Sequence, residues 1–417
     1  MRAPPLRPIA ALALAGALLG ATLSGCGKGG ASPRSGAGSG TLGAAPAAHG
    51  VVGVATKNTT RLGGADPAAD AAAVAQAVYL GLTPATRPQA VVLVDERNWP
   101  AALAASALAS APLGAPLLYA EGDSLPDATV QALRAMRPIG AASLGGAQVI
   151  RIGTSAAVPD GLRTRTIPTA GAGEAAAMAA AVQELFGVAH GGNPRQAIVV
   201  AADAPRQLQM PAAALSAESG SPIVLIERTS VPAAARTALK ALHNPAIYVV
   251  APTTLDSRAY AELAPLGTVV HVAGGAGESP SARESADAVE NAISVSRFSH
   301  GTFGWGIHEA GHGLVFANVS RPLDAPAAAA LSAHGDYGPL LLLADSASVP
   351  GPLTQYLSDI EPGYTAAAPP VREVYNHGWL IGDERSISAL AQAELDSVLE
   401  IAPRQPSAAE QSVAHAE

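Results

Sequence analysis

Cysteine, aromatic residues and positive charge are all scarce in this chain of 417 residues. Cys26 is the only cysteine, so no intramolecular disulfide can form. Aromatic residues make up 4% of the chain, which leaves few flat surfaces on which a base or a sugar could stack. The formal net charge is −8, and this charge repels the phosphates of nucleic acids. We therefore expect no disulfide scaffold and no nucleic-acid partner.

Motifs of common enzyme classes are also missing. The sequence contains no Gly-x-Ser-x-Gly nucleophile motif and no phosphate-binding GxxxxGK[ST] motif. The short run "GGAG" at 274–277 follows the apolar "VVHVA" and is expected to form a tight turn, because the rest of a dinucleotide-binding fingerprint is absent. We expect no catalytic residue and no cofactor.

Small apolar residues dominate what remains. Hydrophobic residues make up 49% of the chain, and much of this fraction is alanine. This composition predicts a globular protein with helix-rich cores packed by small aliphatic side chains.

The N-terminus has the features of an export signal. Arg2 and Arg7 precede the apolar run "IAALALAGALLGATL", which is too short to span a bilayer as a mature helix. The run ends at "LSGC", residues 23–26, which resembles the bacterial lipobox. That resemblance implies cleavage before Cys26 and a diacylglycerol on its sulfur. We therefore predict a lipoprotein at the cell surface, anchored to the outer face of the cytoplasmic membrane.

The same order of motifs occurs three times between residues 58 and 402. Each copy has an apolar run, a helix that opens near a proline, a second apolar run and a further helix. The first apolar runs lie at 90–94, 197–201 and 313–318. In the second runs, Pro116, Pro222 and Pro339 recur at intervals of 106 and 117 residues. Short apolar runs that alternate with amphipathic helices predict an α/β fold of three tandem Rossmann-like or flavodoxin-like repeats with buried parallel sheets.

Boundaries follow from this order of motifs. The predicted segments are a signal peptide at 1–25, lipidated Cys26 with a flexible linker at 26–57, repeats at 58–165, 166–276 and 277–402, and a disordered tail at 403–417.

The first copy resembles a known family of repeats. Its segments "TTRLGGADPAADAAAVAQAVY" at 59–79, "NWPAALAASALA" at 98–109 and "GAPLLYAEGDSLP" at 114–126 are similar to the cell wall-binding repeat of type 2. That family occurs on Gram-positive surface proteins, usually as three tandem copies. The resemblance implies three Rossmann-like domains in a triangular, pseudo-threefold arrangement, and non-covalent binding of anionic cell-wall polymers.

The stretch "GIHEAGHGLVFAN" at 306–318 contains the residue spacing of a zinc-protease motif. On a helix, His308 and His312 would bind Zn²⁺ and Glu309 would activate a water, and "HEAGHGLV" is similar to the "HEAGHALV" of ATP-dependent membrane zinc proteases. The stretch is rich in glycine, which disfavours a helix, and it directly precedes the apolar run at 313–318. A loop that leads into a strand is the preferred interpretation, without a metal site, and a zinc-dependent hydrolase is the alternative.

Ligand-binding residues are predicted from topology, because ligands of open α/β sheets bind at the carboxyl ends of the strands. A polar loop with an arginine follows the first apolar run of each copy. The seven candidates are Asp95, Arg97 and Trp99 in the first loop, Asp203 and Arg206 in the second, and Arg321 and Asp324 in the third. Arginine can hold a phosphate or carboxylate with two parallel hydrogen bonds. The alternatives are that these arginines cap helices or pair with the aspartates, and that Trp99 packs in the core.

The predicted function is non-enzymatic binding of an anionic cell-wall polymer by an envelope lipoprotein. Polar positions of the family pattern hold Ala101, Ala212 and Ala327 here, which leaves open a scaffold that binds an envelope protein instead. Since the chain is acidic, attraction to an anionic polymer must come from local arginines or bridging cations rather than from net charge.

Overall fold

Helices and parallel strands alternate along the chain in the computed structural model. It describes residues 54–167, 175–273, 285–333, 337–364 and 374–403. The predictions for Cys26, for "GGAG" at 274–277 and for the tail after 403 concern residues outside these ranges. Among the described residues, no helix combines the length and the apolar character needed to cross a bilayer.

The first parallel sheet has the strand order β4-β3-β5-β6. Its strands are β3 (Val91–Asp95), β4 (Leu117–Ala120), β5 (Val149–Ile152) and β6 (Thr164–Ile167). The register aligns Val92 with Leu117 and Val91 with Val149. Residues 91–94 of the central strand β3 have no exposed surface, which is why this strand reads as an unbroken apolar run rather than an alternating one.

The second sheet repeats this order as β8-β7-β9-β10. Its strands are β7 (Gln196–Ala201), β8 (Ile223–Ile226), β9 (Ala246–Val250) and β10 (Thr268–Val272). All three neighbouring pairs in this sheet are parallel. The first apolar runs predicted from the sequence agree within one residue at each end with β3, β7 and, in the third sheet, β11 (Gly313–Asn318).

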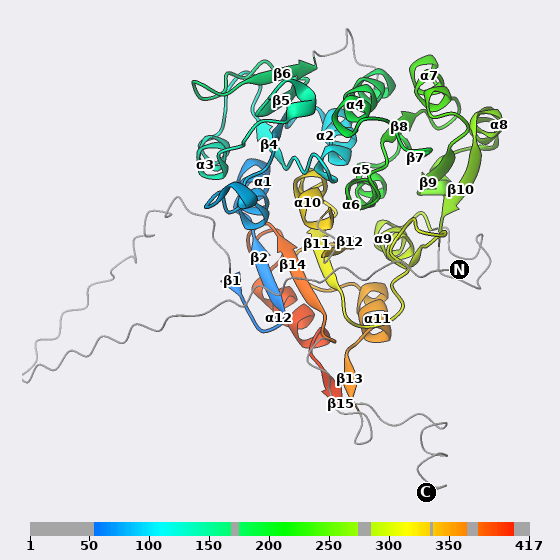
Figure 1. The fold of residues 1–417 in the computed structure, drawn as a ribbon. Helices are drawn as coiled ribbons and strands as arrows, with labels where there is room; N and C mark the ends of the chain where they lie inside the picture. Colours follow the sequence, from blue (N-terminus) through cyan, green and yellow to red (C-terminus); the bar gives the residue numbers. More distant parts are fainter. Residues whose placement is uncertain (1–53, 168–174, 274–284, 334–336, 365–373, 404–417) are drawn as a thin grey trace, which may run out of the picture. The chain divides into compact units, whose positions relative to one another are not determined.

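The third sheet is completed by a strand from the start of the described chain. Its order is β1-β2-β14-β11-β12, and β2 pairs in parallel with β14 (Figure 1). The strands are β1 (Val54–Ala55), β2 (Thr59–Leu62), β11 (Gly313–Asn318), β12 (Tyr337–Leu343) and β14 (His377–Ile381). A short separate pair joins β13 (Gly363–Tyr364) to β15 (Ala402–Pro403). Strand β2 thus takes the fourth parallel position that β6 and β10 take in the other two sheets.

Helices connect the strands and cover the sheets. The helices of the first part are α1 (Pro67–Val78), α2 (Trp99–Ala105), α3 (Asp127–Met136) and α4 (Ala175–His190). Those that follow are α5 (Arg206–Gln209), α6 (Pro211–Ser219), α7 (Ala233–Ala241), α8 (Ser257–Leu263) and α9 (Ala288–Arg297). The last are α10 (Asp324–Ser332), α11 (Gly351–Asp359) and α12 (Ala389–Val398). Short 3₁₀ turns are η1 (Pro84–Thr86), η2 (Ser106–Ala109), η3 (Ala142–Leu144), η4 (Pro252–Thr254) and η5 (Ala264–Leu266).

Alanine-rich helices from distant parts of the chain meet one another. Every residue of α10 is buried, as expected for a helix whose residues between Asp324 and Ser332 are all apolar. Ala109, Ala217 and Ala329 form one buried cluster that joins η2, α6 and α10, and their small side chains allow the helices to approach closely. The predicted α/β class with parallel, Rossmann-like sheets is confirmed, whereas the pseudo-threefold arrangement stays a prediction.

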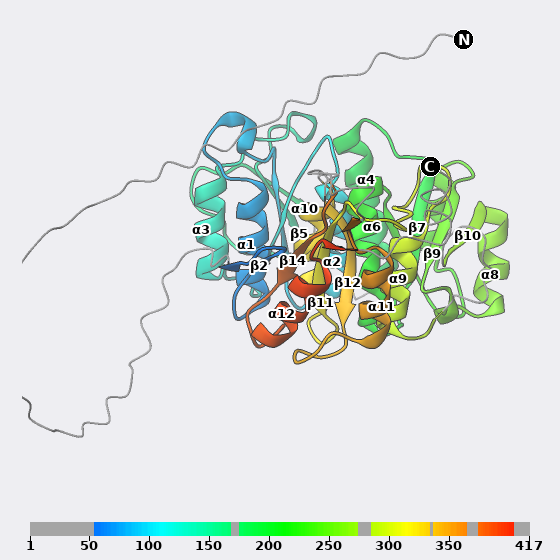
Figure 2. The same cartoon turned by 90° about the horizontal axis from the view of Figure 1, so that it is seen from below.

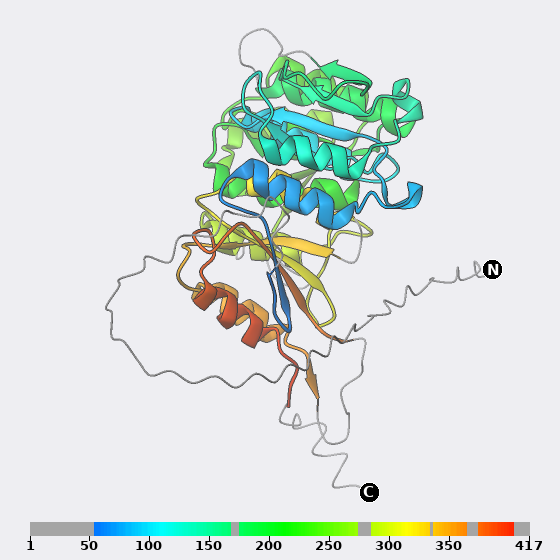
Figure 3. The ribbon, with the colours of Figure 1, turned by 90° about the vertical axis from the view of Figure 1, so that its left-hand side faces the viewer.

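The two ends of the described chain contribute to the same layer. Helix α12 packs against β2 and β14 (Figure 3). The last long helix therefore covers the sheet that contains the first parallel strand. The sequence-predicted first repeat, 58–165, therefore begins with a strand that is hydrogen-bonded in the sheet of the predicted third repeat.

Candidate functional site

The first predicted ligand loop holds an arginine that is already paired. Arg97 donates from Nε and Nη2 to the two carboxylate oxygens of Asp95, at 3.0 and 2.7 Å, and its backbone N–H donates to the same carboxylate at 3.0 Å. The side-chain hydrogen bond from Arg97 holds the pKa of Asp95 below its ordinary value. The guanidinium N–H groups of Arg97 that could have held a ligand carboxylate or phosphate therefore bind Asp95.

Trp99 lies in the core between the first and second loops. The residue is 3% exposed, and its indole Nε1 donates to Oε1 of Gln209 at 2.8 Å. The guanidinium carbon of Arg206 lies 5.8 Å from the centre of the ring. Trp99 therefore packs inside the protein, the alternative to a sugar platform, and Arg206 stacks over it.

The second loop places Asp203 at the wall of a shallow cavity. Its Oδ1 accepts the backbone N–H of Arg228 at 2.9 Å, so it fixes the loop after β8. The cavity measures about 480 Å³ and is lined in part by Asp203, Glu227 and Ser230. Its charged lining is acidic, which does not favour an anionic ligand.

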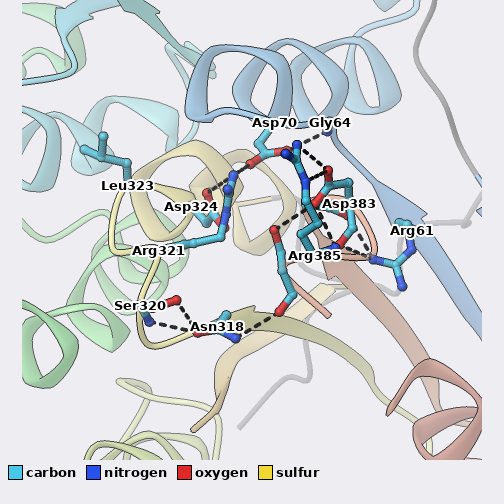
Figure 4. Close-up of polar contacts among 12 residues, drawn as sticks. Arg61, Gly64, Asp70, Asn318, Ser320, Arg321, Leu323, Asp324, Asp383 and Arg385 are labelled. Atoms are coloured by element: carbon cyan, nitrogen blue, oxygen red, sulfur yellow. Dashed lines mark hydrogen bonds and ion pairs between the residues drawn. The ribbon is translucent and has the colours of Figure 1, made fainter. Parts of the chain in front are cut away.

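The third loop forms a buried charge cluster with the first helix. Arg321 donates from Nε to Asp324 Oδ2 at 2.9 Å and from Nη2 to Asp70 (Figure 4). Both carboxylate side chains are fully buried, whereas the Arg321 side chain keeps 21% of its surface exposed. Asp70 also accepts the backbone N–H of Gly64 at 2.7 Å. This Asp70–Arg321–Asp324 cluster joins α1 to the loop before α10.

The cluster has one more acid than base, and its pKa values reflect this. Burial raises the pKa of Asp70, although the charge of Arg321 opposes the rise. Burial, and after it the charge of Asp70, raises the pKa of Asp324 well above its ordinary value. Burial acts to lower the pKa of Arg321, but the charges of Asp324 and Asp70 outweigh it and raise that pKa. The cluster is therefore a structural junction in which two buried acids share one cation.

The residues "RLGGAD" around β2 build the rest of this junction. Arg61 is 4% exposed and donates to the backbone carbonyls of Gly382 at 3.0 Å, Asp383 at 2.8 Å and Ile387 at 2.7 Å. Burial lowers the pKa of Arg61. Gly63 has a φ of +135°, and a Cβ there would lie 2.2 Å from Asp70 Oδ1, so only glycine fits. This motif thus holds β2 against β14.

The carboxyl edge of the first sheet is acidic. Burial and the neighbouring charges of Glu121, Asp95 and Asp66 raise the pKa of Glu96. Because Arg97 is paired with Asp95, no arginine of this loop offsets the remaining acids. The edge chosen from topology is therefore poorly suited to a polyanion.

The zinc-protease-like stretch is a loop. Residues 306–312 form no helix, and 313–318 form strand β11, as predicted. Gly306 and Gly311 have φ values of +62° and +109°, and the backbone N–H groups of Gly311 and His312 donate to Oδ1 of Asn376. Burial lowers the pKa of His312. Over the described part of the chain, no three His, Cys, Asp or Glu side chains are grouped so as to hold a metal ion.

Sequence reasoning missed Asp70, Arg61 and Gln209. Asp70 stands alone among alanines on a helix, and a single acid in an apolar run is the one signal that could have marked it as buried and paired. Gln209 and Arg61 carried no comparable signal, because their partners lie about 110 and more than 320 residues away.

Replacing Arg321 by methionine should destabilise the fold strongly. The change leaves two buried carboxylates without a cation, and breaking a buried ion pair in this way costs about 3–5 kcal/mol. Urea unfolding followed by circular dichroism would measure it. Arg97→Met removes a solvent-exposed pair and should change the unfolding midpoint little. Equal effects of the two substitutions would contradict the assigned role of the cluster.

The contribution of the Asp70–Arg321–Asp324 cluster to stability should fall as the pH rises above the ordinary Asp value of 3.8. The pKa values of Asp70 and Asp324 are raised, so these two groups bind more protons in the folded than in the unfolded state there, and their deprotonation favours unfolding. Asp70→Asn removes one of the two acids, so the variant should lose less stability with rising pH than the unaltered chain. Unfolding free energies of both chains between about pH 4.5 and 8 test it, and an identical pH dependence would refute the linkage of these buried acids to stability.

Comparison with known proteins finds a family that part of the chain resembles. Residues 61–163 match the family described as Cell wall binding domain 2 (CWB2). No curated protein is similar enough in sequence to match the chain.

Solved structures resemble the chain in fold. Cwp6 from Clostridium difficile superposes with a TM-score of 0.60 at 18% identity, over 85% of this chain and 50% of that one. Cwp8 from Clostridium difficile gives a TM-score of 0.56 at 15% identity, over 82% of this chain and 51% of that one. The chain therefore spans about half the length of these two structures. The resemblance seen in the sequence is confirmed, since residues 61–163 match cell wall binding domain 2. The matched segment includes Arg61, which holds β2 against β14, and Asp70, which joins α1 to the loop before α10.

Proposed function

We propose that this protein is a non-enzymatic binding protein of the bacterial cell envelope and that its ligand is a cell-wall polymer. The observation that carries the proposal is the match of residues 61–163 to cell wall binding domain 2. The similar folds of Cwp6 and Cwp8 over more than four fifths of this chain are consistent with it.

The distribution of charge defines how an acidic chain could hold an anionic polymer. The formal net charge is −8, so attraction depends on local groups of arginines or on cations that bridge two anions. Of the predicted loop arginines, Arg97 and Arg321 pair with aspartates of their own loops, whereas Arg206 lies over the Trp99 ring and keeps its positive charge. Attraction to an anionic polymer therefore depends on arginines that are not paired with an acid.

We also propose that a lipid on Cys26 anchors the protein to the outer face of the cytoplasmic membrane. Support comes from "LSGC" at 23–26 after a short apolar run, and from the sequence between Cys26 and β1, whose small residues suit a tether. Two acyl chains bind a membrane far more firmly than one, and two are enough for stable anchoring.

The protein should co-sediment with purified cell walls. A soluble form that lacks residues 1–26 is mixed with washed walls from a Gram-positive bacterium and centrifuged, and the bound fraction is measured over a range of salt. Binding should fall as salt rises, because screening weakens contacts between arginines and anions. A form denatured by heat provides the control. If the folded form stays in the supernatant at every salt concentration, polymer binding fails and an envelope scaffold becomes the better interpretation.

Cys26→Ala should abolish anchoring. The altered chain has no thiol for the lipid, so we expect it in the culture medium or as an uncut precursor, whereas the unaltered chain stays with the membrane. Cell fractionation with immunoblotting measures the distribution, and Ser24→Ala serves as a matched control. Membrane retention of the Cys26→Ala chain, at the size of the processed protein, would contradict the lipid anchor.

A further inference from the structure

Three arginines gather at the amino ends of the strands of the first sheet. Arg87 lies shortly before β3, Arg134 lies in the last turn of α3, and Arg137 follows that helix directly. Within the residues that the structure describes, none of the three forms an ion pair. They differ in this from Arg97 and Arg321, whose positive charge is neutralised by aspartates.

Hydrogen bonds hold the segments that carry these arginines side by side. The backbone N–H of Gly140 donates to the carbonyl of Gln89 at 2.8 Å, which joins the chain after α3 to the chain before β3. Gln148 donates from Nε2 to the carbonyl of Pro138 at 2.7 Å and accepts from the backbone N–H of Arg163 at 3.2 Å. The three arginines therefore stand on a fixed frame. Helix α3 also packs against α1 (Figure 2).

A groove of about 710 Å³ lies between these segments. Its polar and charged lining consists of Arg87, Arg134, Arg137, Gln148 and Asp160. Small-ligand sites commonly measure about 300–1,000 Å³, so the groove is large enough for one unit of a polymer. With three cations and a single carboxylate, the lining is strongly positive within an acidic protein.

The arginines have hydrogen-bonding capacity to spare. Arg87 Nε is buried and has no hydrogen-bond partner among the described residues. Arg137 donates from Nη2 to the carbonyl of Gly81, which positions its side chain and leaves its other N–H groups available. Gly81 has a φ of +67°, and a Cβ there would lie 2.1 Å from the carbonyl oxygen of Ala135, so the contact of this segment with α3 requires glycine.

The C-terminus of α3 does not explain this arrangement by itself. Cations near a helix C-terminus are favoured by its partial negative charge, which accounts for Arg134 and Arg137. It does not account for Arg87, which comes from a different segment and faces the same groove. At the opposite edge of the sheet lie Asp95, Glu96 and Glu121, and of these Asp95 is paired with Arg97. The sheet thus presents a positive amino edge and a negative carboxyl edge.

We infer that this groove binds an anionic group, a phosphate or a carboxylate, of the cell-wall polymer through Arg87, Arg134 and Arg137. The inference rests on the proposed function. Arginine suits this role because its planar fork donates two parallel hydrogen bonds to either anion. A ligand bound at the amino ends of the strands would not disturb the buried Asp70–Arg321–Asp324 cluster.

The test compares two double substitutions that remove the same charge. The full chain, purified in detergent, carries either Arg134→Gln with Arg137→Gln, or Arg195→Gln with Arg228→Gln. Arg195 and Arg228 are exposed residues of the predicted second repeat, and neither forms an ion pair among the described residues. Co-sedimentation with purified walls gives the affinity of each. We expect the groove variant to bind at least about tenfold more weakly than the unaltered chain, a difference of about 1.4 kcal/mol, and the control variant to bind like the unaltered chain.

Further variants separate recognition from stability. Arg134→Gln alone changes an exposed side chain with no ion pair among the described residues, so it should fold normally and still weaken binding. Arg134→Lys with Arg137→Lys keeps the charge but not the fork, and should restore part of the affinity. Thermal unfolding midpoints verify that each variant is folded.

The outcomes distinguish the inference from the function on which it rests. If groove and control variants bind walls equally, the groove inference is overturned and polymer binding stands. If the unaltered chain does not bind walls, both are overturned. Walls treated with hydrofluoric acid, which cleaves phosphodiesters, identify the anion: arginine-dependent binding that is lost on treatment indicates a phosphate, and binding that persists indicates a carboxylate.

Discussion

The parallel pairing of β2 with β14 is the contact on which the rest of the described structure depends. It gives the third sheet its fourth parallel strand, and the partners come from opposite ends of the chain. Buried Arg61 secures it through carbonyls of the chain after β14, and Asp70 carries the connection on to Arg321 before α10. Closing so long a loop costs entropy before any contact is gained, so a dense set of charge-assisted hydrogen bonds at the closure is physically reasonable.

This closure gives Arg321, one of the predicted ligand-binding residues, a structural role. Arg321 is committed to two buried carboxylates, and removing it from them would leave both charges uncompensated. Arg97 is held by Asp95 and Arg206 by the Trp99 ring. The general rule that ligands bind at the carboxyl ends of parallel strands therefore selects, in this chain, residues that already contact other residues of the protein. Three arginines that form no ion pair among the described residues lie at the other edge of the first sheet.

Local pattern predicted the elements well and their partners poorly. The central strands β3, β7 and β11 were placed within one residue because a strand buried on both faces leaves an unbroken apolar run in the sequence. The glycines of "GTFGWGIHEAGHG" correctly indicated a loop before β11, because a helix tolerates them poorly. Asp70 went unnoticed because its importance comes from a partner 251 residues away, to which no local pattern points.

The sequence by itself determined the α/β class, the threefold order of motifs, the likeness to cell wall binding domain 2 and the loop at 306–312, because each of these depends on residues that are near one another in the chain. Only the tertiary structure decided that β2 belongs to the third sheet, that Arg97 and Arg321 are occupied, and that Arg87 meets Arg134 and Arg137 beside one groove. The physical reason is that pairing and charge neutralisation depend on distance in space, and the fold brings together side chains whose separation in sequence carries no information about that distance.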